Sequence, residues 1–267
     1  MPQFIEVTRD GHVLEVKLSK PKVNAIDEVM SREMGEAFAE LRDDPDLRVG
    51  ILTAAGDRIF SAGWDLKALD RGETTLDNWW ETGEYGDGGF AALTENWTLN
   101  KPVIVALNGM AIGGGFELAV AGDLIIAADH VEFGLPEMPL GMVPDAGAIQ
   151  RLPRRIPYNI AMEMFLLGRR MTAAEAAGYG LVNKVVPGDR LMEAAREWAR
   201  QLAKAAPLAL QTVKEVLRAI EGVPLEQAFL KMRTDDLPVY RAMLKSDDAA
   251  EGVRAFVEKR EPVFRGR

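Results

Sequence analysis

Two glutamates, twenty residues apart, are the side chains of this 267-residue chain best suited to acid–base chemistry. Glu117 ends the run Gly-Gly-Gly-Phe-Glu, and Glu137 ends the run Phe-Gly-Leu-Pro-Glu. Paired carboxylates beside exposed backbone N–H groups let an enzyme move protons next to a carbonyl without a metal or a covalent nucleophile. Taken singly, each glutamate could equally be a solvated surface residue, which is the usual fate of this side chain.

The triple glycine before Glu117 has the pattern of a strand–loop–helix junction. An apolar run over 103–107 is followed by Asn108-Gly109 and then by Gly113 to Gly115. The N–H groups and dipole of a helix that starts there would favour negative charge. The spacing matches neither a phosphate loop nor a dinucleotide loop. Glycines that only allow close helix packing are an equal alternative.

The elements that must position these residues alternate between strand and helix. Alternating apolar residues from Leu14 to Leu18 predict a half-buried strand, and the spacing from Val29 to Leu41 predicts a helix. Three apolar runs predict buried strands: 49–53, 103–107 and 124–127. From about residue 189 the pattern is helical only. We therefore predict an α/β protein with a core over 1–190 and a helical region over 191–267.

Composition narrows the possible functions. The net charge of −9 and the pI near 5.0 disfavour nucleic acid as a partner, because phosphate binding needs clustered Lys and Arg. The chain has no cysteine, and His12 and His130 lack metal-ligand spacing, so we expect no metal site. The N-terminus has no signal-peptide pattern, and no apolar run approaches about eighteen residues. We expect a cytoplasmic protein with no membrane partner.

Several ordered motifs together resemble the enoyl-CoA hydratase/isomerase (crotonase) superfamily over nearly the whole chain. The matching segments are 21–26, 60–67, 108–109 with 113–119, 133–137 with 140–141, 258–260 and 262–264. The resemblance implies a crotonase-like spiral of repeated ββα units with a helical C-terminal oligomerisation region that builds trimers or hexamers. It also implies an acyl-CoA substrate, and no cofactor is expected because coenzyme A is part of that substrate.

The resemblance also implies roles for individual residues. It places the backbone N–H groups of Trp64 and Gly114 in an oxyanion hole for the thioester oxygen. Two fixed donors suit this chemistry, because losing one costs roughly 10² to 10³ in rate. Glu117 is expected to orient and deprotonate water, and Glu137 to exchange the α-proton. The implied CoA-binding residues are Lys22, Ala25, Ala62, Asp65, Lys67, Lys259 and Phe264, the last two from this chain or a neighbouring subunit.

One departure from common hydratases points to a subgroup. Asp145 stands where those enzymes usually carry glycine, and it adds a third acid near the expected pocket. Together with Ser61 to Trp64, Gly88 to Ala91 and the C-terminal segments, this residue makes the chain most similar to the carnitinyl-CoA dehydratase subgroup.

Aromatic residues are concentrated between the two loops of the expected site. Four of the five tryptophans lie between residues 64 and 97. Aromatic faces attract quaternary ammonium groups, so some of Trp64, Trp79, Trp80 and Tyr85 are predicted to line a pocket for a trimethylammonium group. Aromatics that pack the loop, or that exclude water from an ordinary acyl chain, are an equal alternative.

The leading prediction is a hydro-lyase that reversibly hydrates an α,β-unsaturated acyl-CoA through an enolate, with crotonobetainyl-CoA and carnitinyl-CoA as a candidate pair. A double-bond isomerase on the same scaffold is the closest alternative, because many isomerases use a single acid–base residue. A non-catalytic CoA-binding or RNA-binding homologue is an alternative of another class. Retention of both glutamates argues against lost catalysis, and the low pI argues against RNA.

Overall fold

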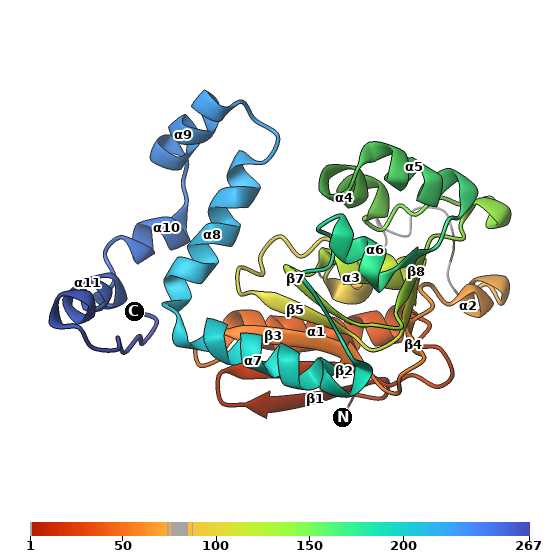
Figure 1. Ribbon diagram of the computed structural model, residues 1–267, viewed down its shortest axis with the longest axis horizontal. Coiled ribbons are helices and arrows are strands. Elements are labelled where there is room, and N and C mark those ends of the chain that lie inside the picture. The colour runs from red at the N-terminus through yellow and green to blue at the C-terminus, as the bar shows by residue number, and fades with distance from the viewer. Residues whose placement is uncertain (1, 74, 76–84, 87) are drawn as a thin grey trace.

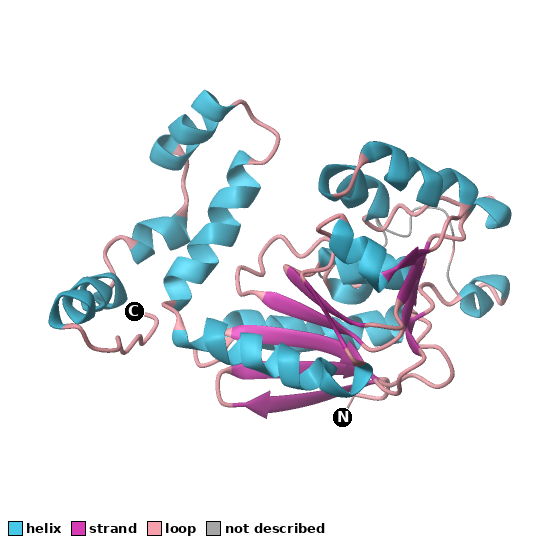
Figure 2. Ribbon diagram, viewed as in Figure 1, coloured by secondary structure: helices cyan, strands magenta, loops and turns pink. Residues whose placement is uncertain are grey.

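A computed structural model of the chain describes residues 2–73, 75, 85–86 and 88–267. Within these residues the strands form a six-stranded sheet, in the order β1-β2-β3-β5-β7-β10, and a four-stranded sheet, in the order β4-β6-β8-β9 (Figures 1 and 2). Helices pack on both sheets and then continue as a C-terminal arm. None of the described helices has the length and apolar character needed to span a membrane.

The elements have the following bounds. The large sheet contains β1 (Ile5–Asp10), β2 (Val13–Leu18), β3 (Val49–Ala54), β5 (Val103–Leu107), β7 (Leu124–Ala128) and β10 (Lys184–Val186). The small sheet contains β4 (Ile59–Ser61), β6 (Met110–Ile112), β8 (Glu132–Gly134) and β9 (Met171–Thr172). The helices are α1 (Glu28–Asp43), α2 (Leu66–Asp70), α3 (Gly114–Ala121), α4 (Ala148–Arg155), α5 (Tyr158–Leu167), α6 (Ala173–Gly178), α7 (Leu191–Lys204), α8 (Pro207–Ile220), α9 (Leu225–Thr234), α10 (Pro238–Met243) and α11 (Asp247–Glu258). Three short 3-10 turns are η1 (Phe90–Ala92), η2 (Met138–Leu140) and η3 (Gly188–Arg190).

Successive ββα units build the two sheets together. In each central unit the first strand joins the large sheet and the second joins the small one, as in β3 and β4 before α2, and β5 and β6 before α3. The strands from β2 to β10 in the large sheet run parallel, and only β1 pairs antiparallel with its neighbour. The predicted α/β class and spiral of ββα units are therefore confirmed.

Side-chain alternation along the central strands explains why helices cover both faces of the large sheet. Leu52 and Val105 belong to the main core, which also includes α1, whereas Ile51 and Ile104 pack against α7. All of these residues are fully buried, as expected for parallel strands with both faces covered. The helix that follows residue 190 is thus part of the packed core, and the division into two regions at that residue stays a prediction.

The C-terminal arm consists of α8 to α11 and extends away from the sheets (Figure 1). Ser246 caps α11 by accepting a hydrogen bond from the Ala249 N–H at 3.1 Å. The chain end folds back onto this helix, where the Asp248 carboxylate accepts hydrogen bonds from the N–H groups of Arg265 and Gly266, each at 2.7 Å. Arg48 joins the arm to the core by donating to the Phe264 carbonyl.

Candidate active site

Three short strands of the small sheet bring the sequence motifs together. The strands β4, β6 and β8 are parallel neighbours, and each has only three residues. The motif segments 62–64, 113–114 and 135–137 directly follow their carboxyl ends. Because the carboxyl ends of parallel strands meet at one edge of a sheet, the three loops converge there. This edge is the candidate active site.

Glycines allow the first two loops to touch. A Cβ atom on Gly63 would lie 2.5 Å from the Gly114 nitrogen, and the φ angle of Gly63 is +82°. A Cβ atom on Gly115 would lie 2.3 Å from the Ser61 carbonyl oxygen. The close-packing interpretation of the triple glycine is therefore correct, but the same close approach also sets the loops of Trp64 and Gly114 side by side.

The backbone N–H groups of Trp64 and Gly114 are the two donors that the resemblance assigns to the oxyanion hole. In the part of the chain that the structure describes, neither group donates a hydrogen bond to a protein acceptor. The segment around Trp64 is nevertheless fixed, because the Ile26 N–H donates to the Gly63 carbonyl at 2.7 Å and the Asp65 N–H donates to the Ile26 carbonyl at 2.9 Å. Two adjacent, fixed and unpaired donors are an arrangement that can stabilise an oxyanion.

Glu117 lies on α3 with its side chain almost completely buried, at 4% exposure. Its Oε1 accepts a hydrogen bond from the Ala148 N–H at 3.0 Å, at the first residue of α4. Burial raises the pKa of Glu117 to about 8, the Ala148 N–H opposes this rise, and the charges of Glu137 and Asp145 reinforce it. The carboxyl group can therefore hold or release a proton near neutral pH.

Glu137 reaches the same edge from the loop after β8. The Gly113 N–H donates to the Gly134 carbonyl at 2.9 Å, and a Cβ atom on Gly113 would lie 2.9 Å from Glu137 Oε1. Glu137 Oε2 is buried and has no hydrogen-bond partner among the described residues. Burial raises the pKa of Glu137 to about 7, and the Asp145 charge adds to the rise. Both predicted carboxylates are thus brought to the edge where the unpaired N–H groups lie.

Asp145 differs from the two glutamates because its side chain is exposed. It lies just before α4 and lines a cavity of about 660 Å³ between α4 and α8, together with Arg151 and Trp97. The lining of this cavity does not include Glu117 or Glu137. The negative charge of Asp145 acts on both glutamates, so this residue belongs electrostatically to their site.

Trp64 and Tyr85, two residues of the predicted aromatic pocket, lie against each other. Their rings meet edge to face, with centroids 6.4 Å apart and an interplanar angle of 66°. They line a small cavity of about 110 Å³ with the acidic residues Asp27, Glu28 and Glu73. Trp79 and Trp80, the other two aromatics of the prediction, lie outside the described residues.

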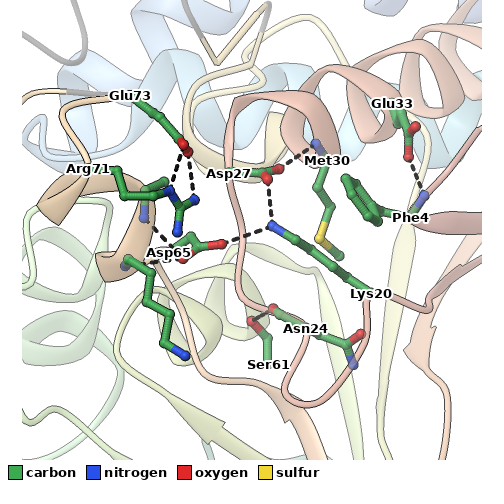
Figure 3. Close-up of polar contacts among 12 residues, drawn as sticks. Phe4, Lys20, Asn24, Asp27, Met30, Glu33, Ser61, Asp65, Arg71 and Glu73 are labelled. Carbon is green, nitrogen blue, oxygen red and sulfur yellow. Dashed lines mark hydrogen bonds and ion pairs between the residues drawn. The ribbon is translucent and has the colours of Figure 1, made fainter.

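The loops that carry the first five predicted CoA-binding residues also lie side by side. The Ala62 N–H donates to the Val23 carbonyl at 2.9 Å, and Asn24 and Ser61 are joined by a hydrogen bond of 2.7 Å (Figure 3). The structure therefore brings the segment of Lys22 and Ala25 next to that of Ala62, Asp65 and Lys67. The basic residues Lys20, Lys22 and Arg58 line a cavity of about 380 Å³ beside these loops.

Asp65 has structural partners that the sequence did not indicate. It caps α2 by accepting hydrogen bonds from the Lys67 and Ala68 N–H groups, and it forms an ion pair with Lys20 at 3.1 Å (Figure 3). Lys20 and the Ala148 N–H are the two site components that sequence reasoning missed. No sequence signal marked the Ala148 N–H. Lys20 had a weak signal, because it lies between a predicted strand and the Pro21-Lys22 segment of the family motif.

Lys259 and Phe264 lie away from the other predicted CoA-binding residues within one chain. Lys259 is the residue that ends α11, and Phe264 follows in the tail that packs on Gly252 of that helix. Figure 1 shows α11 and the chain end on the opposite side of the molecule from α2. The role of these two residues in CoA binding stays a prediction.

A spiral of ββα units whose edge carries two buried carboxylates and two unpaired N–H donors defines a class of acyl-thioester enzymes. The chain belongs to the enoyl-CoA hydratase/isomerase family, whose model matches residues 8–267. It is 50% identical, over the full length of both chains, to the carnitinyl-CoA dehydratases of Salmonella typhimurium and Citrobacter koseri. These similarities confirm the family and subgroup resemblances expected from the sequence.

Solved structures of known proteins agree with this assignment. The enoyl-CoA hydratase from Mycobacterium tuberculosis is similar with a TM-score of 0.88 at 35% identity, and the whole of both chains is covered. The enoyl-CoA hydratase from Bacillus anthracis gives a TM-score of 0.87 at 34% identity and covers 99% of this chain and 100% of its own. Family, relatives and fold together support the hydration or dehydration of an acyl-CoA by a hydro-lyase.

Proposed function

We propose that this protein reversibly adds water across the α,β-double bond of an acyl-CoA thioester, with crotonobetainyl-CoA and carnitinyl-CoA as the substrate pair. The observation that carries the reaction type is the pair Glu117 and Glu137, buried and titrating near neutral pH, at the edge that holds the unpaired N–H groups of Trp64 and Gly114. The two curated relatives, which are carnitinyl-CoA dehydratases, support the choice of substrate.

In the hydration direction the thioester oxygen accepts hydrogen bonds from Trp64 and Gly114, so that negative charge can develop on it. Glu117 takes a proton from water as the water oxygen bonds to the β-carbon, and Glu137 gives its proton to the α-carbon. In dehydration Glu137 removes the α-proton and Glu117 protonates the departing hydroxyl group. Both carboxyl groups titrate near neutrality, so one proton on the pair supplies an acid and a base together. Coenzyme A enters with the substrate, and the steps require no separate cofactor or metal.

The aromatic cavity at Trp64 is proposed to receive the trimethylammonium group of the acyl chain. Its support is the pairing of two aromatic rings with the acidic lining of Asp27, Glu28 and Glu73. The proposal extends to Trp79 and Trp80, which sequence alone assigns to the same pocket. Asp145 is proposed to act on the pair Glu117 and Glu137 through its charge.

Trp64→Phe tests this pocket, because it keeps the backbone N–H and replaces the indole with a weaker cation binder. Cation–π contacts are worth about 0.5 to 2 kcal/mol, so kcat/KM for crotonobetainyl-CoA should fall roughly 2- to 30-fold. The value for crotonyl-CoA, measured as a control, should change less than about threefold. Equal losses on both substrates would contradict the cation pocket.

We also propose that coenzyme A lies along Lys22, Ala25, Ala62, Asp65 and Lys67 and is completed by Lys259 and Phe264 of a neighbouring subunit. This arrangement requires a homo-oligomer, and the family resemblance implies a trimer or a hexamer. It is supported by large apolar side chains that the arm leaves exposed, including Leu225, Phe229, Val253, Phe256 and Val257. A cytoplasmic location is proposed because a chain without cysteine is compatible with a reducing compartment.

The reaction type is tested by following the ultraviolet absorbance of the enoyl thioester with crotonyl-CoA and crotonobetainyl-CoA. The wild-type protein should consume both, and Glu117→Gln should lower kcat by roughly 10² to 10⁴ because it removes the acid–base group that handles water. Gln can still accept from the Ala148 N–H, so the loop should keep its position. A variant that keeps double-bond isomerase activity would favour the isomerase, and an inactive wild type would favour a non-catalytic protein.

A further inference from the structure

Lys20 lies where three segments meet, between the end of β2 and the N-termini of α1 and α2. Its ammonium group donates to Asp27 Oδ2 at 2.5 Å and to Asp65 Oδ2 at 3.1 Å (Figure 3). The side chains of Lys20, Asp27 and Asp65 are only 13%, 24% and 17% exposed. One ammonium is therefore shared by two poorly solvated carboxylates, and without it two like charges would face each other.

Both carboxylates are also helix caps. Asp27 Oδ1 accepts from the Met30 N–H at 2.9 Å, and Asp65 Oδ1 accepts from two N–H groups at the start of α2. Burial raises the pKa of Asp65, but the hydrogen bond and the charge of Lys20, with the help of the cap N–H groups, bring it below its ordinary value. Lys20 thereby keeps the cap of α2 charged and joined to the cap of α1.

The segment that carries the Trp64 N–H lies directly beside this junction. Ile26 and Trp64 form a parallel β-bridge, and the Asp65 N–H donates to the Ile26 carbonyl at 2.9 Å. Asp27 directly follows Ile26, and Asp65 directly follows Trp64. Lys20 therefore pairs with the residue that comes after each partner of the bridge. Asp27 and Asp65 therefore lie directly beside the bridge that holds Trp64.

We propose that Lys20 is a positioning residue for the oxyanion hole, which acts through Asp27 and Asp65 to aim the Trp64 N–H at the thioester oxygen. The proposal rests on the proposed function, because it takes the Trp64 N–H as a donor to the substrate. Loss of the Lys20 ammonium should lower kcat more than it raises KM, because the donor stabilises the charge that develops in the transition state.

Lys20→Met tests the proposal, because it keeps the length of the side chain and removes its charge. We expect kcat to fall about 10- to 100-fold, up to the cost of a lost oxyanion donor, while KM for crotonobetainyl-CoA changes less than about threefold. Lys20→Arg should recover most of the activity. Lys17→Met is the matched control, because Lys17 lies on β2, the strand that precedes Lys20, and pairs with Glu6 at an exposed position.

A spectroscopic measurement separates positioning from general stability. The carbonyl stretch of bound butyryl-CoA, labelled with carbon-13 at the thioester, should shift to lower frequency in the wild type because two N–H donors polarise the bond. The shift should be smaller in Lys20→Met and restored in Lys20→Arg. If Lys20→Met keeps the wild-type shift and kcat and only unfolds at a lower temperature, the proposal is wrong.

If Lys20→Met does not fold, Asp65→Asn decides the question, because it keeps an acceptor for the cap and loses the ion pair. A wild-type carbonyl shift in that variant would overturn the proposal. A wild type that is inactive on both enoyl thioesters would contradict the proposed function, and the butyryl-CoA shift would still test the role of Lys20.

Discussion

Glu117 and Glu137 titrate near neutrality for the same main reason, which is burial, but their surroundings differ. Glu117 has a hydrogen-bond donor in the Ala148 N–H, whereas Glu137 Oε2 has no partner among the described residues. The Glu137 charge raises the pKa of Glu117, so the protonation of one glutamate depends on that of the other and the apparent pKa values belong to the pair. The charge of Asp145 raises the pKa of both glutamates, so Asp145 also influences the protonation of the pair.

Asp145→Asn should move the pH profile of kcat/KM toward lower pH on both limbs. The sign follows from the charge: a nearby carboxylate disfavours ionisation of Glu117 and Glu137, so its removal lowers the pKa of each. The maximal rate should stay within roughly threefold if Asp145 acts only through its charge. Asp129→Asn, at an exposed position beside His130, is the control. A profile that keeps its limbs would contradict the electrostatic role.

At the scale of elements, long and short strands have different roles. The long strands of the large sheet build the core, and the short strands of the small sheet position the loops of the candidate site. Strands β3 and β5 are completely buried, whereas β4, β6 and β8 have three residues each and end at the motif loops. The close approach of Gly63 to Gly114 joins two of these loops. The geometry of the donor pair therefore depends on this contact.

Gly63→Ala should nearly abolish activity, with kcat at least roughly 10² lower, because the new Cβ atom would push the two N–H donors apart. Gly180→Ala separates this effect from backbone strain. Gly180 has a similar φ angle of +78°, but a Cβ atom there meets nothing within 4 Å. Both variants should lose about 1 to 2 kcal/mol of unfolding free energy from the left-handed backbone, and Gly63→Ala should lose more because its Cβ atom meets backbone atoms, as measured by denaturant titration. Only Gly63→Ala should lose activity, and equal activities would contradict the contact.

The elements that sequence could predict are those with enough residues to show a period. The alternation from Leu14 to Leu18 and the apolar run 49–53 predict β2 and β3 correctly, and the helix from Val29 to Leu41 lies within α1. Three-residue strands are too short for any period, so β4, β6 and β8 did not stand out. Their motifs were recognised by residue type and order instead.

Long-range contacts mark the limit of prediction at the candidate site. The pairing of Lys20 with Asp27 and Asp65 depends on the meeting of two helix caps that are 38 residues apart in sequence, which no local pattern encodes. The Ala148 N–H reaches Glu117 only because α4 packs beside α3. The two carboxylates could be predicted from their residue type and motifs. The groups that shift their pKa values come from tertiary packing and could not be predicted.

At the scale of the whole molecule, the arm is the part whose surface suits a second copy of the chain. Phe256, Val257 and Val253 on α11 are 85%, 73% and 68% exposed, an unusual fate for large apolar side chains in one region. The same helix leads into Lys259 and Phe264, which the resemblance assigns to the CoA site. Assembly and substrate binding are thus expected to depend on one element.

Phe256→Asp should shift the protein from the proposed oligomer toward smaller species, because a charge would have to be buried in the proposed apolar contact. Mass measured by light scattering checks the assembly, and KM for the acyl-CoA should rise severalfold if Lys259 and Phe264 act across the interface. Lys245→Asp, an exposed charge change on the same arm, should leave both quantities unchanged. An unchanged mass for Phe256→Asp would contradict a contact through α11.

The glycine contacts at the small-sheet edge have a consequence for how this chain can diverge. Positions 63, 114 and 115 have no room for a methyl group, because a Cβ atom at each would lie 2.7 Å or less from a neighbouring atom. The positions of the two carboxylates and of Asp145 already carry side chains, so this constraint on a Cβ atom does not apply to them. Related sequences can therefore differ in their acidic residues and in the reactions that they catalyse while these glycines stay the same. A comparison of homologues should find the glycines in sequences that act on different substrates.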